Sequence, residues 1–202
     1  MGLREMRPRQ RLLIVDLEAT CWERAQHRAE DMETIEIGAL LVDPLEPDAP
    51  PQEFERLVRP VHRPQLSDFC TTLTGIRQAD VDAAATFPSA FAAFCEWFGE
   101  PGGVLFASWG RYDRRQLVSD CARHGLDYPF GERHLNLKHW CAARLGMRPG
   151  GLAQTVAKCG FTFDGRHHRG LDDARNIWRV TRAAGGEALH ELLAADTGAD
   201  GR

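Results

Sequence analysis

The sequence predicts a single-domain α/β fold, in which a mixed sheet is flanked by helices. Three observations support this prediction. A chain of 202 residues suits one domain with a substantial buried core. Its content of 43% hydrophobic and 27% charged residues is ordinary for a globular protein. Candidate antiparallel strands come first, and strands and helices alternate afterwards, which is typical of a mixed α/β sheet.

The first part of the chain contains the predicted meander. After a basic flexible tail over residues 1–10, an apolar run predicts the first strand over 11–17. Strands over Thr34–Val42 and Glu53–Arg59 follow, and a proline-rich turn from Pro44 to Pro51 separates them.

The rest of the chain predicts alternating strands and helices. An apolar stripe at helical spacing indicates a core-facing helix: Phe87, Ala90, Phe91, Phe94, Trp97 and Phe98. Gly103–Ala107 predicts a strand, and a helix follows at Asp113. Further predicted elements are a short strand over Leu135–Leu137 and helices from Lys138, Leu152 and Leu171. Residues 11–185 then form the domain, and residues 186–202 a C-terminal helix and polar tail.

Asp16 and Glu18 stand two residues apart where the first predicted strand ends. Because alternate side chains of a strand share a face, the two carboxylates would point into one small volume. Such anions repel each other unless a cation lies between them, and carboxylate oxygens suit Mg²⁺ or Mn²⁺. A strand end that runs into an acidic loop gives the same pattern, so the pair needs support from elsewhere in the chain.

His168 and Asp173 lie five positions apart where a loop enters the last long helix. Ile177 and Val180 follow Asp173 at helical spacing, so the Asp173 carboxylate should face the core side. Asp172 shares its face with arginines and should be solvated. A carboxylate on the core side needs a partner to offset its desolvation, and a metal held by the first pair would supply one.

Asp113 is a further candidate, at the start of the helix that follows the Gly103–Ala107 strand. Aspartate is frequent in a first helical turn because it complements the helix dipole, so this position alone indicates little.

The ordered set Asp-x-Glu, Asp, His-x4-Asp resembles the DEDDh superfamily of 3′-to-5′ exonucleases. Asp16-Leu17-Glu18-Ala19-Thr20-Cys21-Trp22 is similar to the first motif of its histone-mRNA and enhanced-RNAi exonuclease branch. Trp109-Gly110-Arg111-Tyr112-Asp113 resembles the second motif, with tyrosine where tryptophan is usual, and His168-Arg169-Gly170-Leu171-Asp172-Asp173 resembles the third. Leu73-Thr74-Gly75-Ile76 is similar to the intervening segment. The resemblance implies the ribonuclease-H-like fold.

The resemblance also implies roles for these residues. Asp16, Glu18 and Asp173 would bind one of two Mg²⁺ or Mn²⁺ ions, while Asp16 bridges to the second ion and Asp113 holds that ion's waters. His168 would be the general base, because an imidazole can take a proton from water at neutral pH. The residues expected to bind substrate are Ala19, Thr20, Trp109 and Arg169.

The implied activity is hydrolysis of single-stranded RNA from its 3′ end, either RNA alone or RNA and DNA. Recognition of a particular RNA structure is either absent or supplied by a protein partner. A catalytically weak nucleic-acid-binding or partner-binding relative is the alternative, which five retained site residues oppose. A nucleotide-binding α/β protein of another kind is opposed by the lack of a Gly-x-Gly-x-x-Gly or P-loop stretch after the first strand.

The net charge of −4 is unevenly distributed. Residues 1–110 contain 10 lysines and arginines against 18 acidic residues, whereas residues 111–182 contain 14 against 7. In the second segment a local surface that attracts phosphate is expected from residues next to the motifs: Arg111, Arg114, Arg115, Arg166 and Arg169.

The cysteines and the apolar runs indicate the expected cellular location. Six cysteines fall singly, without a Cys-x-x-Cys pair, so we expect reduced core thiols rather than a zinc site or disulfides. The longest apolar run is too short to span a bilayer, and the N-terminus lacks a signal region. A cytoplasmic location without membrane association is expected.

Overall fold

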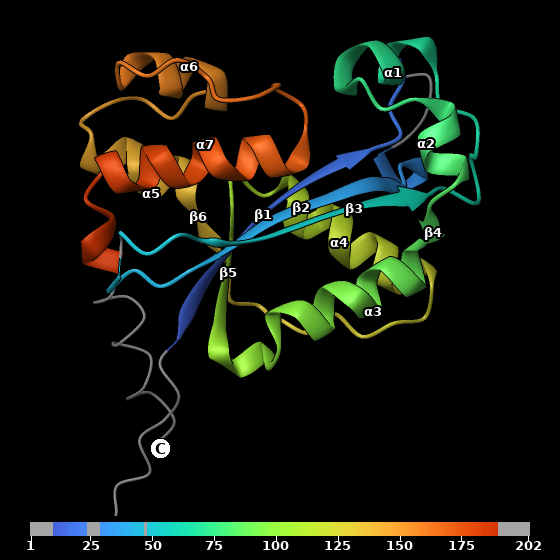
Figure 1. Cartoon of the computed structure of the whole chain (residues 1–202), viewed down its shortest axis with the longest axis horizontal. Helices are drawn as coiled ribbons and strands as arrows, with labels where there is room; N and C mark the ends of the chain where they lie inside the picture. Colours follow the sequence, from blue (N-terminus) through green and yellow to red (C-terminus); the bar gives the residue numbers. More distant parts are fainter. Residues whose placement is uncertain (1–9, 24–28, 47, 190–202) are drawn as a thin grey trace, which may run out of the picture.

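The computed structural model describes residues 10–23, 29–46 and 48–189. Within them, a six-stranded mixed sheet with strand order β4-β3-β2-β1-β5-β6 is covered by helices on both faces (Figure 1). This architecture confirms the predicted α/β fold. The predicted basic tail and the polar C-terminal end fall almost entirely outside the described residues, and the division of the chain at residues 11 and 185 stays a prediction.

Strand β1 (Arg11–Ala19) lies at the centre of the sheet. It pairs antiparallel with β2 (Thr34–Val42), which pairs antiparallel with β3 (Gln52–Arg59), as the predicted meander requires. On its other side β1 pairs parallel with β5 (Val104–Ser108). The short strands β4 (Ala85–Thr86) and β6 (Leu135–Asn136) pair parallel with β3 and β5.

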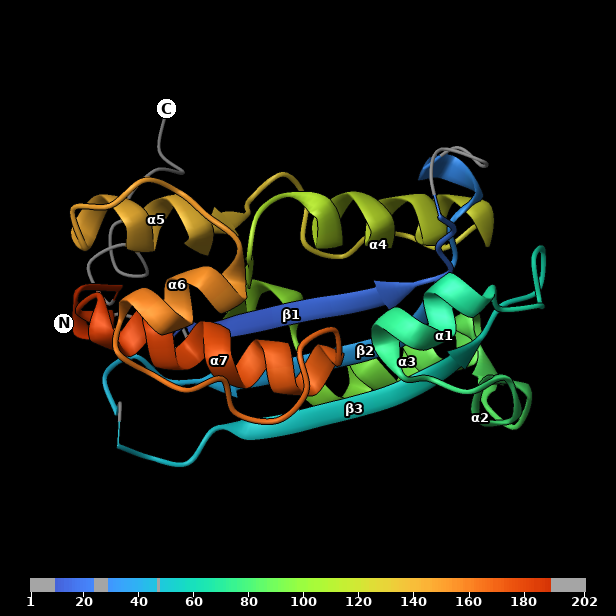
Figure 2. The ribbon, with the colours of Figure 1, turned by 90° about the horizontal axis from the view of Figure 1, so that it is seen from above.

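Helices pack in two layers. The helices are α1 (Asp68–Thr74), α2 (Gln78–Asp82), α3 (Phe87–Phe98), α4 (Tyr112–Arg123), α5 (Leu137–Arg144), α6 (Leu152–Lys158) and α7 (Gly170–Ala183). Short 3₁₀ turns cover Ala29–Asp31, Pro101–Gly103 and Gly186–Ala188. Helices α3 and α4 cover one face of the sheet, and α5, α6 and α7 lie on the other (Figure 1). Figure 2 shows α7 running alongside β1 and β2.

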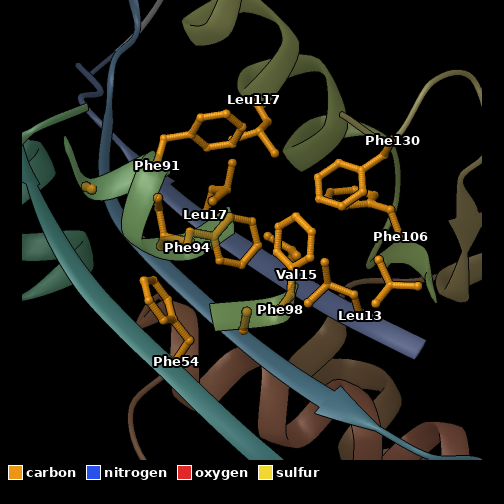
Figure 3. Close-up of a cluster of buried hydrophobic side chains, with 14 of the residues drawn as sticks. Leu13, Val15, Leu17, Phe54, Phe91, Phe94, Phe98, Phe106, Leu117 and Phe130 are labelled. Atoms are coloured by element: carbon orange, nitrogen blue, oxygen red, sulfur yellow. The ribbon is translucent and has the colours of Figure 1, made fainter. Parts of the chain in front are cut away.

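Successive residues of β1 face opposite layers. Leu13, Val15 and Leu17 point to α3 and α4, where they pack against the predicted aromatic stripe (Figure 3). Leu12 and Ile14 point to α5, α6 and α7. Because side chains of a strand alternate, Asp16 and Glu18 continue this second face toward the start of α7. The strand also extends to Ala19, two residues beyond the predicted end, so both carboxylates lie within it.

Helices α1 and α2 were not expected from the sequence. They contain seven and five residues, too few for an apolar period to become visible. Local caps define α1 instead: the Ser67 side chain accepts a hydrogen bond from the backbone N–H of Cys70, and the helix ends at Gly75, whose φ is 72°. This helix borders the end of β1 that carries the acidic pair.

Candidate active site

Four carboxylates from three elements meet at the C-terminal end of β1. Carboxylate oxygens of Asp16, Glu18 and Asp173 lie within 4.8 Å of one another. Asp113 joins them because its Oδ1 accepts a hydrogen bond from the backbone N–H of Leu17, at 3.0 Å. The structure therefore brings together the four carboxylates that the motifs predicted.

The position of Asp113 follows from the sheet topology. Strand β5 runs parallel to β1, so the C-terminal ends of both strands lie at the same edge, and the chain passes from β5 directly into α4. Asp113 occupies the first turn of α4, where a carboxylate is favoured by the helix dipole. Its side chain is buried against β1, so it is more than an ordinary helix-start residue.

The start of α7 is fixed to β2 by Glu36, which is buried opposite Glu18 in the β1–β2 ladder. Its Oε2 accepts a hydrogen bond from the backbone N–H of Gly170 at 2.8 Å. The Arg169 guanidinium donates to Glu36 Oε1 at 2.8 Å and forms a second ion pair with Glu55. A buried carboxylate with these partners holds the first turn of α7 against the sheet.

Asp173 is oriented as the helical spacing predicted. Ile177 and Val180 on the same face are fully buried, and the Asp173 side chain is buried with them. Its Oδ2 accepts a hydrogen bond from the backbone N–H of His168 at 3.0 Å. Its Oδ1 is buried and has no hydrogen-bond partner within the described residues. Because burying an unpartnered carboxylate oxygen is costly, this atom is available to a ligand.

Asp172 differs from its prediction. It was expected to be solvated, but its carboxylate accepts hydrogen bonds from the backbone N–H of Arg166 at 2.9 Å and from the Arg175 guanidinium at 3.0 Å. It therefore ties the loop before α7 to the helix. The arginines that share its face are the reason, because Arg175 lies one turn away and can reach it.

The loop before α7 carries two adjacent histidines. The rings of His167 and His168 lie 4.0 Å apart between centroids. His168 has a φ of 67°, a left-handed conformation that is uncommon outside glycine and is frequent at functional sites. Partial burial, followed by His167 and Arg166, lowers the pKa of His168. The imidazole is therefore neutral at pH 7 and able to accept a proton.

These groups line a hollow of about 350 Å³. Its lining includes Ala19 and Trp109, two of the four residues expected to bind substrate. Thr20 and Arg169 are not part of this lining. The Thr20 hydroxyl accepts a hydrogen bond from the backbone N–H of Glu33, and the Arg169 guanidinium is engaged by its two carboxylates. Substrate binding by Thr20 and Arg169 stays a prediction.

Burial dominates the electrostatics of the hollow, and repulsion between carboxylates adds to it at Asp16, Glu18 and Asp173. Burial, together with the neighbouring carboxylates, raises the pKa of Glu18 to about 9 and that of Asp16 well above its ordinary value. Burial also raises the pKa of Asp173 to about 7 and that of Asp113 to about 6, although backbone hydrogen bonds to both carboxylates oppose the rise. The four carboxylates cannot all be charged at neutral pH without a nearby cation.

Comparison with known proteins identifies the family and the fold. A family model described as exonuclease, RNase_T, matches residues 13–181. The chain belongs to the exonuclease family.

Two relatives show which exonucleases this chain resembles. The 3'-5' exonuclease Snipper of Drosophila melanogaster is 30% identical over 192 residues, which cover 85% of this chain and 68% of Snipper. ERI1 exoribonuclease 2 of Mus musculus is also 30% identical, over 85% of this chain, but the chain spans only 28% of that relative's length.

A solved structure agrees with these relatives. The nuclease domain of 3'hExo, a DEDDh family member bound to rAMP, superposes with a TM-score of 0.78 at 29% identity, covering 90% of this chain and 92% of that domain. The predicted membership of the DEDDh group and the ribonuclease-H-like fold are therefore confirmed.

The residues present fit the divalent ions that this exonuclease family implies. Hard oxygen ligands at this spacing suit Mg²⁺ and Mn²⁺. The unpartnered Asp173 Oδ1 and the raised carboxyl pKa values both indicate that a cation is needed to complete the cluster.

Several residues of the site were not found by sequence reasoning. Side chains that also line the hollow come from other parts of the chain: Cys21, Met32, Leu73, Tyr112, Leu152 and His167. Of these, Cys21, Leu73 and Tyr112 lie inside motifs that resembled the family, which was a usable signal. Glu36 gave a weaker signal, since it is a charged residue within a mostly apolar strand.

Proposed function

We propose that this protein removes nucleotides one at a time from the 3′ end of single-stranded RNA, and that DNA is a poorer substrate. The observation that carries the proposal is the convergence of Asp16, Glu18, Asp113, Asp173 and His168 on one hollow. Hydrolysis of a phosphodiester needs a base for water and neutralisation of charge on the phosphate oxygens, and this set provides for both.

Each residue has a distinct role in the proposed mechanism. Asp16, Glu18 and Asp173 would hold one divalent ion, and Asp16 would hold the second together with Asp113, which would act through that ion's waters. When bound, such ions neutralise the charge of the phosphodiester and lower the pKa of water. His168 accepts the proton of the attacking water at a ring nitrogen, which its lowered pKa leaves free.

Placement of the substrate depends on the rest of the hollow. Ala19 and Trp109 line it together with Leu73. The Trp109 indole N–H donates to the Gly150 carbonyl at 3.1 Å, so the ring has a fixed orientation. Apolar walls of this kind receive the terminal nucleotide by shape and stacking, without reading its base.

The preference for RNA rests on the relatives. Names of relatives include exoribonucleases, and the 3'hExo nuclease domain was solved with rAMP. Because the chain spans less than a third of ERI1 exoribonuclease 2, the substrates and partners of that protein are not transferred beyond this proposal. No helix in the described part of the chain is long and apolar enough to cross a membrane. The cytoplasmic location, the protein partner and the choice between Mg²⁺ and Mn²⁺ stay predictions.

The test is an assay with 5′-labelled RNA and DNA oligomers of one sequence in Mn²⁺, Mg²⁺ or EDTA. We expect a ladder of products shortened from the 3′ end, faster on RNA and absent in EDTA. A circular RNA of the same sequence should resist cleavage, because it has no 3′ end. Binding without shortening, in either metal, would favour the alternative of a catalytically weak nucleic-acid-binding relative.

A further inference from the structure

A second hollow, of about 340 Å³, lies beside the candidate active site. It is lined by Arg111, Arg114, Arg115, Glu132 and His134. The lining therefore contains three arginines and one carboxylate. None of the residues that carry the proposed hydrolysis lies in this lining.

The positive charge of this arginine hollow is not compensated by ion pairs. Elsewhere in the described chain arginines pair with carboxylates, as Arg169 does with Glu36 and Arg175 with Glu53. Within the described residues, Arg111, Arg114 and Arg115 form no salt bridge. Three unpaired guanidinium groups in one concavity repel one another, and an anion between them would relieve that repulsion.

Arg114 is held in place before any ligand arrives. Its Nη2 donates to the Gly131 carbonyl at 3.1 Å, and its guanidinium lies 5.6 Å from the centre of the Tyr128 ring. Its Nε is buried and has no hydrogen-bond partner within the described residues. Because less side-chain entropy is lost when a fixed guanidinium binds, this arrangement favours recognition of a phosphate.

His134 adds no charge to the hollow. Its Nε2 lies 2.9 Å from Ser108 Oγ, and burial, followed by Arg114 and Arg111, lowers its pKa to about 4. A neutral imidazole leaves the arginines as the source of charge at neutral pH. The hydroxyl of Ser108 also contacts the Gly110 carbonyl, so this side of the hollow is tied to the segment that precedes α4.

The two hollows share the first turn of α4. Tyr112 and Asp113 line the active-site hollow, whereas Arg111, Arg114 and Arg115 line the arginine hollow. Lys138 adds charge near this turn: it lies next to Gly110 and lowers the pKa of Asp113. A chain leaving the active site across the start of α4 thus meets positive charge immediately.

We propose that the arginine hollow binds backbone phosphates of the single-stranded nucleic acid, 5′ to the nucleotide being removed. Guanidinium groups match phosphate oxygens in pairs of hydrogen bonds, and contacts to the backbone are independent of base sequence. This inference rests on the proposed function, because the substrate's 3′ end must lie in the active-site hollow for its upstream part to reach the arginines.

The test compares wild type with Arg111→Gln/Arg115→Gln, two exposed positions whose side chains form no hydrogen bond or ion pair within the described residues. RNA substrates run from a dinucleotide to a 12-mer in Mn²⁺. For the 12-mer we expect KM to rise at least about tenfold with kcat within twofold of wild type. The dinucleotide has no backbone phosphate 5′ to the scissile one, so it should be the substrate affected least.

Salt dependence gives an independent readout. For a single strand, log(kcat/KM) falls with log[KCl] by about 0.7 for each phosphate contact, so the double variant should lose about 1.4 from the slope on the 12-mer. The control is Lys158→Gln/Arg182→Gln, which removes two exposed charges at the ends of α6 and α7 and should keep the wild-type slope. Arg182 is ion-paired with the exposed Asp48, so the control tests removal of charge outside the hollow rather than removal of unpaired charge.

The outcomes separate this inference from the proposed function. If wild type cleaves the 12-mer but the double variant shows the wild-type KM and slope at every length, the inference is wrong and an acidic protein partner becomes the better occupant. If wild type cleaves neither the 12-mer nor the dinucleotide, the proposed function fails, and the inference falls with it.

Discussion

Gly38 of β2 and Gly170 of α7 are in direct backbone contact. A Cβ atom built on Gly38 would lie 1.9 Å from the carbonyl carbon of Gly170, and one built on Gly170 would lie 2.8 Å from the carbonyl oxygen of Asp16. Only glycine at both positions lets the helix start reach the sheet. Since Asp173 lies one turn further along α7, this contact determines how closely its carboxylate approaches Asp16 and Glu18.

Gly38→Ala should therefore damage the site through the backbone. The added methyl group would push α7 outward, destabilise the fold by about 1–3 kcal/mol and lower activity more than stability alone explains. Thermal unfolding and cleavage of a labelled RNA in Mn²⁺ measure the two effects. Gly102→Ala is the matched control, because no atom lies within 4 Å of its added Cβ. Equal behaviour of the two variants would contradict this account of the helix contact.

Stability without metal should fall as pH rises. The carboxyl pKa values of Glu18, Asp113 and Asp173 are raised to about 9, 6 and 7, so the folded protein keeps protons that the unfolded chain has released. The lowered pKa values of His134, His167 and His168 act in the opposite direction below about pH 6.5, so the free energy of unfolding in EDTA should decrease between about pH 7 and about pH 9. Thermal unfolding across this range measures it. In Asp16→Ala the decrease should be shallower, since one repelling carboxylate is gone.

Binding of divalent ions should restore the stability that the metal-free protein loses as pH rises. Mg²⁺ or Mn²⁺ needs deprotonated carboxylates, so the rise in Tm on adding either ion should be larger at about pH 8 than at about pH 5. The same melting experiment with Asp16→Ala should show almost no rise. A rise that survives in Asp16→Ala would place the metal elsewhere.

Substitutions of the two adjacent histidines should have different effects on kcat. His168→Ala should lower kcat by roughly 10²-fold or more, because the general base is lost, while leaving the metal-induced rise in Tm nearly intact. His167→Ala should have the smaller effect on kcat, since His168 is the histidine five residues before Asp173. Rates measured with both variants on one RNA decide the assignment, and a harmless His168→Ala would reverse it.

Features that depend on residues close together in the chain could be predicted from the sequence. The alternation along β1 placed Asp16 and Glu18 on one face, and helical spacing after Asp173 placed Ile177 and Val180 in the core, both as observed. The sequence could not reveal partners that are distant in the chain. Arg169 stands next to His168, which suggested substrate binding, yet its partner Glu36 lies 133 positions away.

Short elements and backbone contacts were also invisible in the sequence. Helices α1 and α2 are too short for a periodic pattern, so the wall of the hollow that contains Leu73 was not expected. Gly38 lies within an apolar strand, where a glycine can mark a bulge or a close backbone approach. Only the fold shows that the approaching backbone belongs to Gly170.

The final prediction separates the two aspartates at the start of α7. Asp173 has an unpartnered buried oxygen beside Asp16 and Glu18, so Asp173→Asn should abolish cleavage of any oligonucleotide and the metal-induced rise in Tm. Asp172 instead accepts hydrogen bonds from Arg166 N–H and the Arg175 guanidinium. These two donors reach different oxygens of Asp172, so the single amide oxygen of Asp172→Asn can keep only one of the bonds. The variant should lose on the order of 1 kcal/mol of stability and keep much of its turnover. Cleavage of one labelled RNA in Mn²⁺ by both variants is the measurement. An active Asp173→Asn enzyme would overturn the proposed site, because no other carboxylate of α7 reaches the cluster in the described structure.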